Sequence, residues 1–217
     1  MTIAGRFSDL PTSLISGHGA FHAATKGELG QQLSQLKDGQ SPKVLVISCV
    51  DSRVDPATLF GSAPGEIFVT RNVANLVPAY AEQASTKSGS HGTETAIEYA
   101  VKALKVEHIV VLGHAGCGGV GACIASKSAP LDFHFIGSWI SLLDQARDKV
   151  LGQGADDPQV ALEHEGVRAS LERLADYPFV ATALERGALK LHGGWFNIGE
   201  AHLYWMDGTG RFAPVES

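Results

Sequence analysis

Two short runs of apolar, mostly β-branched residues constrain the fold of this chain more than any other feature. They cover residues 44–47 and 109–112, and their composition is typical of parallel strands that are buried on both faces. Cys49 follows the first run, and His114 and Cys117 follow the second. Ligands of open α/β sheets bind just beyond the carboxyl ends of such strands, so the sequence predicts a site there.

The side chains at these two strand ends offer the donors of a zinc site. If the strands lie side by side, Cys49, His114 and Cys117 converge, and their thiolate and imidazole groups suit zinc. Three protein ligands leave a fourth position, which is typical of catalytic rather than structural zinc. Each segment alone is equally consistent with a core cysteine or a hydrogen-bonded histidine. The glycines around Cys117 and the Asp51–Arg53 pair favour the metal site, because an ion pair near a buried site is costly without a use.

The remaining pattern predicts one domain of the α/β class over residues 1–217. The chain has 217 residues and 44% hydrophobic content, enough for one sizeable core, and no segment resembles a linker. Strand and helix patterns alternate, which favours a mostly parallel central sheet flanked by helices. We expect residues 1–40 to form an N-terminal helical arm and residues 41–217 to form the α/β core.

The element boundaries follow from periodicity and turn residues. Residues 10–36 predict short or broken helices, and Asp55-Pro56 predicts a short helix over 54–60. Thr93 is the expected N-cap of a helix over 93–105, whereas residues 71–91 read as irregular. The other expected helices are one that follows the glycine loop after Cys117 and those over 136–150, 160–175 and 178–184. The other expected strands or hairpin segments are 66–70, 189–192, 195–198 and 203–206.

Charge and cysteine content exclude several function classes. The chain has 17 Lys and Arg against 23 Asp and Glu, a formal net charge of −6, and no basic run, so binding to nucleic acid or anionic membranes is disfavoured. No apolar stretch has the length of a signal peptide or a membrane span. Three cysteines do not suggest a disulfide framework, so we expect a cytoplasmic protein in which Cys123 only packs.

The motifs taken together resemble the β-class carbonic anhydrases. The similarity covers most of the chain, and a glutamine nine residues before Cys49 resembles the plant-type branch. Val50 departs from the serine that is common in the family, but the ligand and the acidic residue beside it remain. The matching segments, in order, are Gln40-Ser41-Pro42-Lys43, Cys49-Val50-Asp51-Ser52-Arg53, residues 64–75, residues 97–101, Gly113-His114 to Cys117-Gly118-Gly119, and residues 191–196.

The resemblance implies a zinc lyase that interconverts carbon dioxide and bicarbonate. It implies Zn²⁺ bound by Cys49, His114 and Cys117, and a catalytic dyad of Asp51 and Arg53. It also implies a homodimer, or a higher oligomer built from dimers, with active sites at the subunit interface. The residues implied to bind substrate, some of them from the partner chain, are Gln40, Phe68, Val73, Tyr99 and the backbone N–H of Gly118.

Two other functions fit the same residues. A hydrolase of carbon disulfide or carbonyl sulfide on this fold would carry the same ligands, and assays with each gas would distinguish it. A catalytically silent zinc-binding or partner-binding protein is the second alternative. The presence of both Asp51 and Arg53 argues against it, because a purely structural site does not need that pair.

Overall fold

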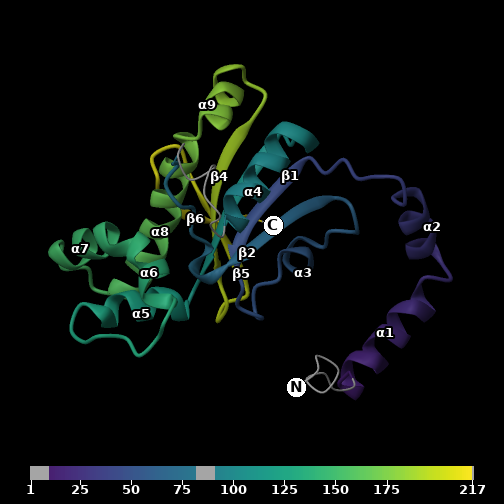
Figure 1. Ribbon diagram of the computed structural model, residues 1–217. Helices are drawn as coiled ribbons and strands as arrows, with labels where there is room; N and C mark the ends of the chain where they lie inside the picture. The colour runs from purple at the N-terminus through teal and green to yellow at the C-terminus, as the bar shows by residue number, and fades with distance from the viewer. Residues whose placement is uncertain (1–9, 82–90, 217) are drawn as a thin grey trace, which may run out of the picture. The chain divides into compact units, whose positions relative to one another are not determined.

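The computed structural model describes residues 10–81 and 91–216, and the chain divides into two compact units (Figure 1). The first unit, residues 1–40, contains helices α1 (Thr12–Ala24) and α2 (Glu28–Gln35). The helices are separated at residues 25–27, where Gly27 stands before the first residue of α2. Broken helices in this region are therefore confirmed, although Gly17 and Gly19 lie inside α1 without interrupting it.

The second unit, residues 41–217, is built around one six-stranded sheet of order β2-β1-β3-β4-β5-β6. The first four strands in that order are parallel, and β5 and β6 continue the sheet in antiparallel fashion. The predicted mostly parallel sheet is thus confirmed. The strands are β1 (Val44–Cys49), β2 (Ile67–Asn72), β3 (His108–His114), β4 (Lys190–Asn197), β5 (His202–Met206) and β6 (Phe212–Pro214).

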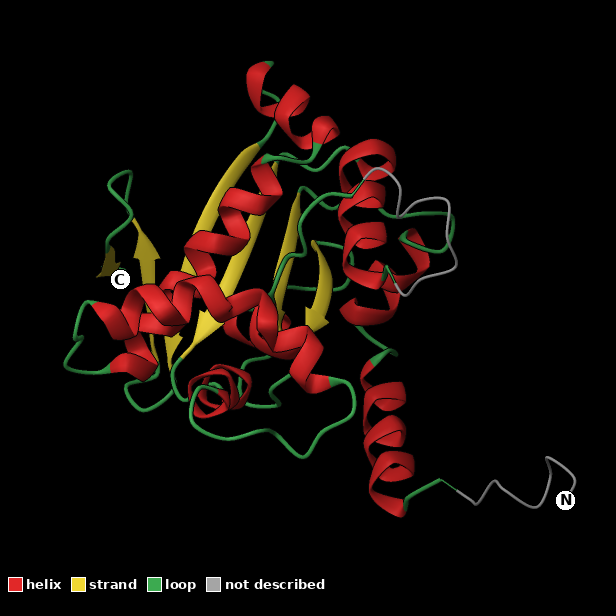
Figure 2. Ribbon diagram, turned by 60° about the vertical axis from the view of Figure 1, so that its left-hand side comes forward, coloured by secondary structure: helices red, strands yellow, loops and turns green. Residues whose placement is uncertain are grey.

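The register of the central strands places both predicted ligand segments at one edge of the sheet. In the β1–β3 pair Ser48 lies opposite Leu112, so Cys49 and His114 follow within two residues of the last paired position. The sheet residues alternate between two apolar layers. Leu45 and Ile47 belong to a large core with helix residues such as Val167, whereas Val46 packs with other strand residues on the opposite face. Helices cross in front of the strands in Figure 2.

Helices flank the sheet as expected, and two of them begin at recognisable caps. Asp55 accepts a hydrogen bond from the Thr58 N–H at the start of α3, and Asp157 accepts one from the Val160 N–H at the start of α8, each followed by proline. No helix in residues 10–81 or 91–216 is long and apolar enough to cross a membrane. The helices of this unit are α3 (Pro56–Phe60), η2 (Val73–Asn75), α4 (Gly92–Glu98), η4 (Tyr99–Leu104), α5 (Gly118–Ser126), α6 (Ile136–Ile140), η5 (Ser141–Leu143), α7 (Asp144–Gly152), α8 (Pro158–Ala175) and α9 (Pro178–Glu185).

Several predicted boundaries are wrong. His91, not Thr93, precedes α4, because the buried Thr93 hydroxyl instead accepts a hydrogen bond from Asn72 at 3.1 Å. The single helix expected over 136–150 is three elements, α6, η5 and α7. Residues 190–197 form one strand rather than two, and β6 was not expected. Within the segment expected to be irregular, η2 is ordered, and residues 82–90 lie outside the described residues.

Candidate metal centre

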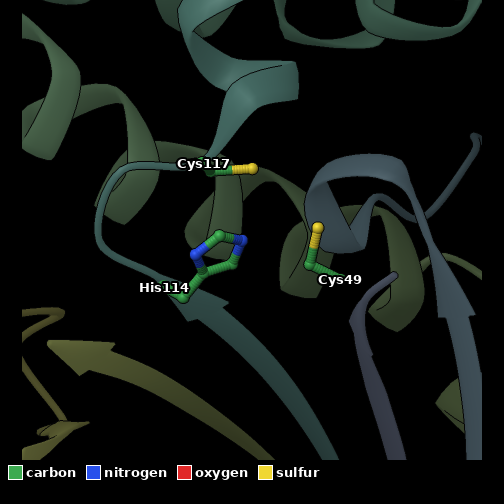
Figure 3. Close-up of side chains that lie close together, drawn as sticks. All are labelled: Cys49, His114 and Cys117. Atoms are coloured by element: carbon green, nitrogen blue, oxygen red, sulfur yellow. The ribbon is translucent and has the colours of Figure 1, made fainter. Parts of the chain in front are cut away.

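The two strand ends bring together three side chains that could hold a metal ion. Cys49 ends β1, His114 ends β3, and Cys117 stands one residue before α5, where the loop turns at Gly116 with a left-handed φ of 65°. Their ligand atoms all lie within 4.8 Å of one another, and all three residues are buried. Figure 3 shows the three side chains pointing toward a common space. The convergence expected from the sequence is therefore present.

The His114 ring is oriented so that one nitrogen faces this space. Its Nδ1 lies 3.0 Å from the carbonyl oxygen of Ala115, which can only accept, so Nδ1 carries the proton. Its Nε2 is buried and has no hydrogen-bond partner among the described residues. A neutral imidazole whose other nitrogen is held by a carbonyl is the usual state of a histidine that binds a metal. This orphaned nitrogen fits a zinc ligand.

The electrostatics of the two thiols also fit a cation. The Cys117 thiol hydrogen-bonds to the Cys49 sulfur and thereby holds the pKa of Cys49 well below its usual range, although burial opposes this. The same contact, together with burial, raises the pKa of Cys117. One thiolate is therefore favoured without a cation. A bound divalent ion stabilises both thiolates, as expected for two cysteine ligands.

The segment η2, which lies next to Cys49, has a strained backbone. Ala74, in η2, has φ 64° and ψ 23°, a left-handed conformation that is unfavourable for alanine. The residue is buried, with 1% of its surface exposed. Its backbone N–H is one of the groups that lower the pKa of the Cys49 thiol. Such conformations cost on the order of 1–3 kcal/mol and persist where the surroundings enforce them, often at functional sites. Here the strain directs an N–H group at the sulfur.

Asp51 and Arg53 form a two-point ion pair beside the three side chains. Arg53 donates from Nε to Asp51 Oδ1 at 2.9 Å and from Nη2 to Oδ2 at 2.7 Å. The hydrogen bond from Arg53 holds the pKa of Asp51 far below its usual range. Asp51 Oδ2 is also 4.0 Å from His114 Nε2. Arg53 Nη2 reaches the Gly116 carbonyl at 3.4 Å, so the pair connects both ligand-bearing loops.

Sequence reasoning missed Arg71 as a member of this site. Its Nε donates to the Cys49 carbonyl at 2.9 Å and its Nη2 to the Asp51 carbonyl at 2.7 Å, while Nη1 lies 3.3 Å from Asp55. Arg71 therefore fixes the backbone between Cys49 and Asp51. A basic residue at the end of a strand that pairs with β1 is the signal that could have identified it, since Ser48 lies opposite Arg71.

The five residues expected to bind substrate do not all gather in one place. Val73 packs against the apolar cluster that contains Cys49, and Gly118 is the first residue of α5 after Cys117. Phe68 and Tyr99 instead form a separate pair with ring centroids 5.9 Å apart. Phe68 precedes Asn72, the register partner of Cys49, by four residues, which corresponds to roughly 13 Å along a strand. Gln40 is exposed and ends the first unit.

An apolar groove lies next to Val73. Its volume is about 530 Å³, and its lining includes Asn72, Val73, Phe135 and Trp139. Trp139 Nε1 donates to the Val73 carbonyl at 2.8 Å and so fixes the backbone at that position. Phe135 is 77% exposed, which is unusual for a large apolar side chain. The described part of the chain therefore offers an apolar surface close to the three metal-binding residues.

Comparison with known proteins places the chain in one family. The sequence profile of the carbonic anhydrase family matches residues 44–203, which include β1 to β4 in full and the start of β5. Beta carbonic anhydrase 5 of Arabidopsis thaliana, a chloroplastic protein, is 37% identical over 172 residues, which are 77% of this chain. The match spans 55% of the length of that plant protein, so the chain corresponds to about half of it.

Solved structures agree with the sequence match. The β-carbonic anhydrase CcaA has a TM-score of 0.86 and 30% identity, with 95% of this chain and 92% of that chain covered. A tetrameric β-carbonic anhydrase from the filamentous ascomycete Sordaria macrospora has a TM-score of 0.76 and 27% identity, with 95% of this chain and 96% of that chain covered. On the sequence profile, the identity and the shared fold, this chain belongs to the β-class carbonic anhydrase family.

Proposed function

We propose that the chain is a zinc-dependent carbonic anhydrase, which catalyses the reversible hydration of carbon dioxide to bicarbonate and a proton. The observation that carries this proposal is the position of the Asp51–Arg53 pair beside the three buried metal-binding side chains. Cys49, His114 and Cys117 would hold the zinc ion. When bound, zinc supplies the Lewis acidity that makes water a nucleophile near neutral pH.

The contacts of Asp51 suit an orienting role. Because Arg53 lowers its pKa, the Asp51 carboxylate stays ionised at neutral pH and accepts hydrogen bonds without retaining a proton. Its Oδ2 faces His114 Nε2, so it can accept the hydrogen of a reacting water and direct the oxygen lone pair at the carbon of carbon dioxide. The two hydrogen bonds from Arg53 fix the carboxylate in that orientation.

The surroundings suit a small molecule without charge or dipole. Val73 is a better neighbour for carbon dioxide than a charged side chain, and it lies beside the apolar cluster containing Cys49. The first N–H groups of a helix have no partner within the helix, so the Gly118 N–H can donate to a bicarbonate oxygen.

We propose that the active unit is a homodimer or an oligomer of dimers. Phe68 lies on β2, four residues before the register partner of Cys49, and its ring pairs with that of Tyr99. Both side chains therefore suit the site of a partner chain better than the site of their own chain. Tyr99 is 50% exposed, as expected for a side chain that a second copy would cover. The Sordaria relative is tetrameric. A cytoplasmic location is likewise a proposal, supported by three free cysteines.

The test is a set of stopped-flow assays on the purified, zinc-loaded chain with carbon dioxide, carbonyl sulfide and carbon disulfide. The proposal expects rapid hydration of carbon dioxide and slower turnover of both sulfur compounds. A preference for either sulfur compound would identify a hydrolase on the same fold. Zinc binding with no turnover of any of the three would identify a catalytically silent protein. Sedimentation of the same sample tests the dimer.

A further inference from the structure

A buried carboxylate on α8 contacts the loop that carries Cys117. Glu163 is 3% exposed and accepts three hydrogen bonds from uncharged N–H groups. The backbone N–H of Cys117 donates to Oε1 at 2.9 Å, the Gln159 side-chain amide donates to Oε1 at 2.7 Å, and Trp195 Nε1 donates to Oε2 at 3.0 Å. An anion buried this deeply is costly unless its hydrogen bonds serve a purpose.

Gln159 binds the carbonyl group of Cys117. It lies one turn before Glu163 on α8, and its Nε2 donates to the Cys117 carbonyl oxygen at 3.0 Å. The N–H and the C=O of Cys117 are therefore both bound by one helix. Two fixed points on the backbone of a residue set the direction of its Cα–Cβ bond, and so restrict the Cys117 sulfur to the few positions that its χ1 rotamers allow.

The pattern of donors explains why position 163 carries a carboxylate rather than an amide. Donors face both oxygens of Glu163, so its partner groups require acceptors at both positions. A carboxylate accepts at both oxygens, whereas a glutamine presents an NH₂ group at one of them. In a glutamine variant that NH₂ would face either the Trp195 N–H or the Cys117 N–H, two donors in contact.

We propose that Glu163 and Gln159 are positioning residues that hold Cys117 in the geometry required for metal binding. This inference rests on the proposed function, because it takes Cys117 as a zinc ligand. It adds that a pair of residues on α8, outside the metal-binding set, determines how tightly the ion is held. Residues that orient a metal ligand commonly change metal affinity about 10- to 100-fold when they are replaced.

The first experiment compares Glu163→Gln with the matched control Glu165→Gln. Glu165 lies on the same helix and forms ion pairs with Lys149 and Arg168. Within the described part of the chain it makes no hydrogen bond to the loop that carries Cys117. We expect Glu163→Gln to weaken zinc affinity, measured by competition with a chelator, about 10- to 100-fold. Hydrogen exchange at the Cys117 amide should also accelerate in the zinc-free protein. Glu165→Gln should change neither quantity.

The second experiment tests for rescue. Replacing Trp195 by phenylalanine removes the donor at Oε2, so the NH₂ group of Glu163→Gln no longer faces an N–H group. The double variant Glu163→Gln/Trp195→Phe should regain the zinc affinity and the Cys117 amide protection of Trp195→Phe alone. If Glu163 serves only to connect α8 with β4, Trp195→Phe will lower stability, and the double variant will not regain zinc affinity or Cys117 amide protection. That result overturns the inference.

Gln159→Ala keeps the inference testable if Glu163→Gln fails to fold. Gln159 is only partly buried, so its loss should leave the far-ultraviolet circular dichroism spectrum unchanged while weakening zinc affinity. Unchanged affinity in this variant contradicts the inference. If the unsubstituted chain itself binds no zinc, the proposed function fails instead. The exchange rate of the Cys117 amide, measured without metal, still reports separately whether the two side chains hold that residue.

Discussion

Gly119, in the first turn of α5, packs directly against Val73 of η2. A Cβ atom at position 119 would lie 2.6 Å from Val73 Cγ1 and 3.1 Å from the Ala74 Cβ. The helix that follows Cys117 therefore touches the strained segment that supports Cys49. This close approach, which only glycine permits, joins the two halves of the metal centre.

The first prediction follows from that contact. Gly119→Ala should lower the free energy of unfolding by about 1–3 kcal/mol. The added methyl group would collide with Val73, whose side chain has little freedom at χ1 and whose segment, η2, already has a strained backbone. Gly118→Ala is the matched control, since no atom lies within 4 Å of the Cβ it would add, and its effect should stay within about 0.5 kcal/mol. Denaturant unfolding of both variants measures the difference. Equal stabilities would contradict the packing described here.

The second prediction concerns metal content. The unsubstituted chain should contain one zinc ion per chain, and Cys49→Ala or Cys117→Ala should lose nearly all of it, because each removes one of three ligands. Cys123→Ala is the control. Cys123 is equally buried, but its sulfur faces Asp144 and Arg147 at 3.9 Å rather than the other cysteines. Elemental analysis showing full zinc in either ligand variant would refute the assignment.

The third prediction concerns the dependence of stability on pH. Burial, reinforced by Arg168, lowers the pKa of His164 from 6.5 to about 4. Between those values the unfolded chain binds a proton that the folded chain does not, so this residue destabilises the protein as pH falls from 6.5 toward 4. His164 stacks on Phe212 with centroids 4.2 Å apart, so His164→Phe keeps an aromatic ring there.

Thermal unfolding midpoints at several pH values measure this effect. His164→Phe should lose less stability than the unsubstituted chain between pH 6.5 and 4, and the two proteins should show parallel behaviour above pH 7. An identical slope below pH 6.5 would mean that His164 is protonated in the folded protein.

The convergence of the three candidate metal-binding residues could be predicted from the sequence, because it depends on features that composition reveals. Buried parallel strands have an apolar composition that is easily recognised, and the ends of neighbouring parallel strands meet at one edge of the sheet. These two features are enough to predict that Cys49 and His114 lie close together once β1 and β3 are neighbours, as they are. The short helix after Asp55 was equally predictable, since an acidic N-cap followed by proline acts through local contacts.

The features that could not be predicted depend on contacts between distant segments. Gly193 and Gly194 read as a break, but they lie within β4 because side chains such as Trp205 and Leu112 occupy the space beside Gly194. The interruption of the expected helix over 136–150 is different, because it comes with a local contact: the Ser141 hydroxyl donates to the Ser138 carbonyl at 2.8 Å. The sequence places Arg71 near the end of a strand, but the direction of its side chain, toward the Cys49 and Asp51 carbonyls, depends on the pairing of β2 with β1.

The fourth prediction isolates the dyad. Asp51→Asn keeps the shape of the side chain but removes one acceptor and the charge that pairs with Arg53. It should leave the zinc content unchanged, because Asp51 is not one of the three clustered residues. Val50→Ala, an exposed neighbour, is the matched control and should behave as the unsubstituted chain does.

The rate of carbon dioxide hydration by Asp51→Asn, measured by stopped flow on protein of verified zinc content, tests the central claim most directly. If the Asp51–Arg53 pair orients the reacting water, the rate falls about 10²-fold or more while the zinc stays bound. A zinc-loaded Asp51→Asn variant that hydrates carbon dioxide at the rate of the unsubstituted chain would contradict the account.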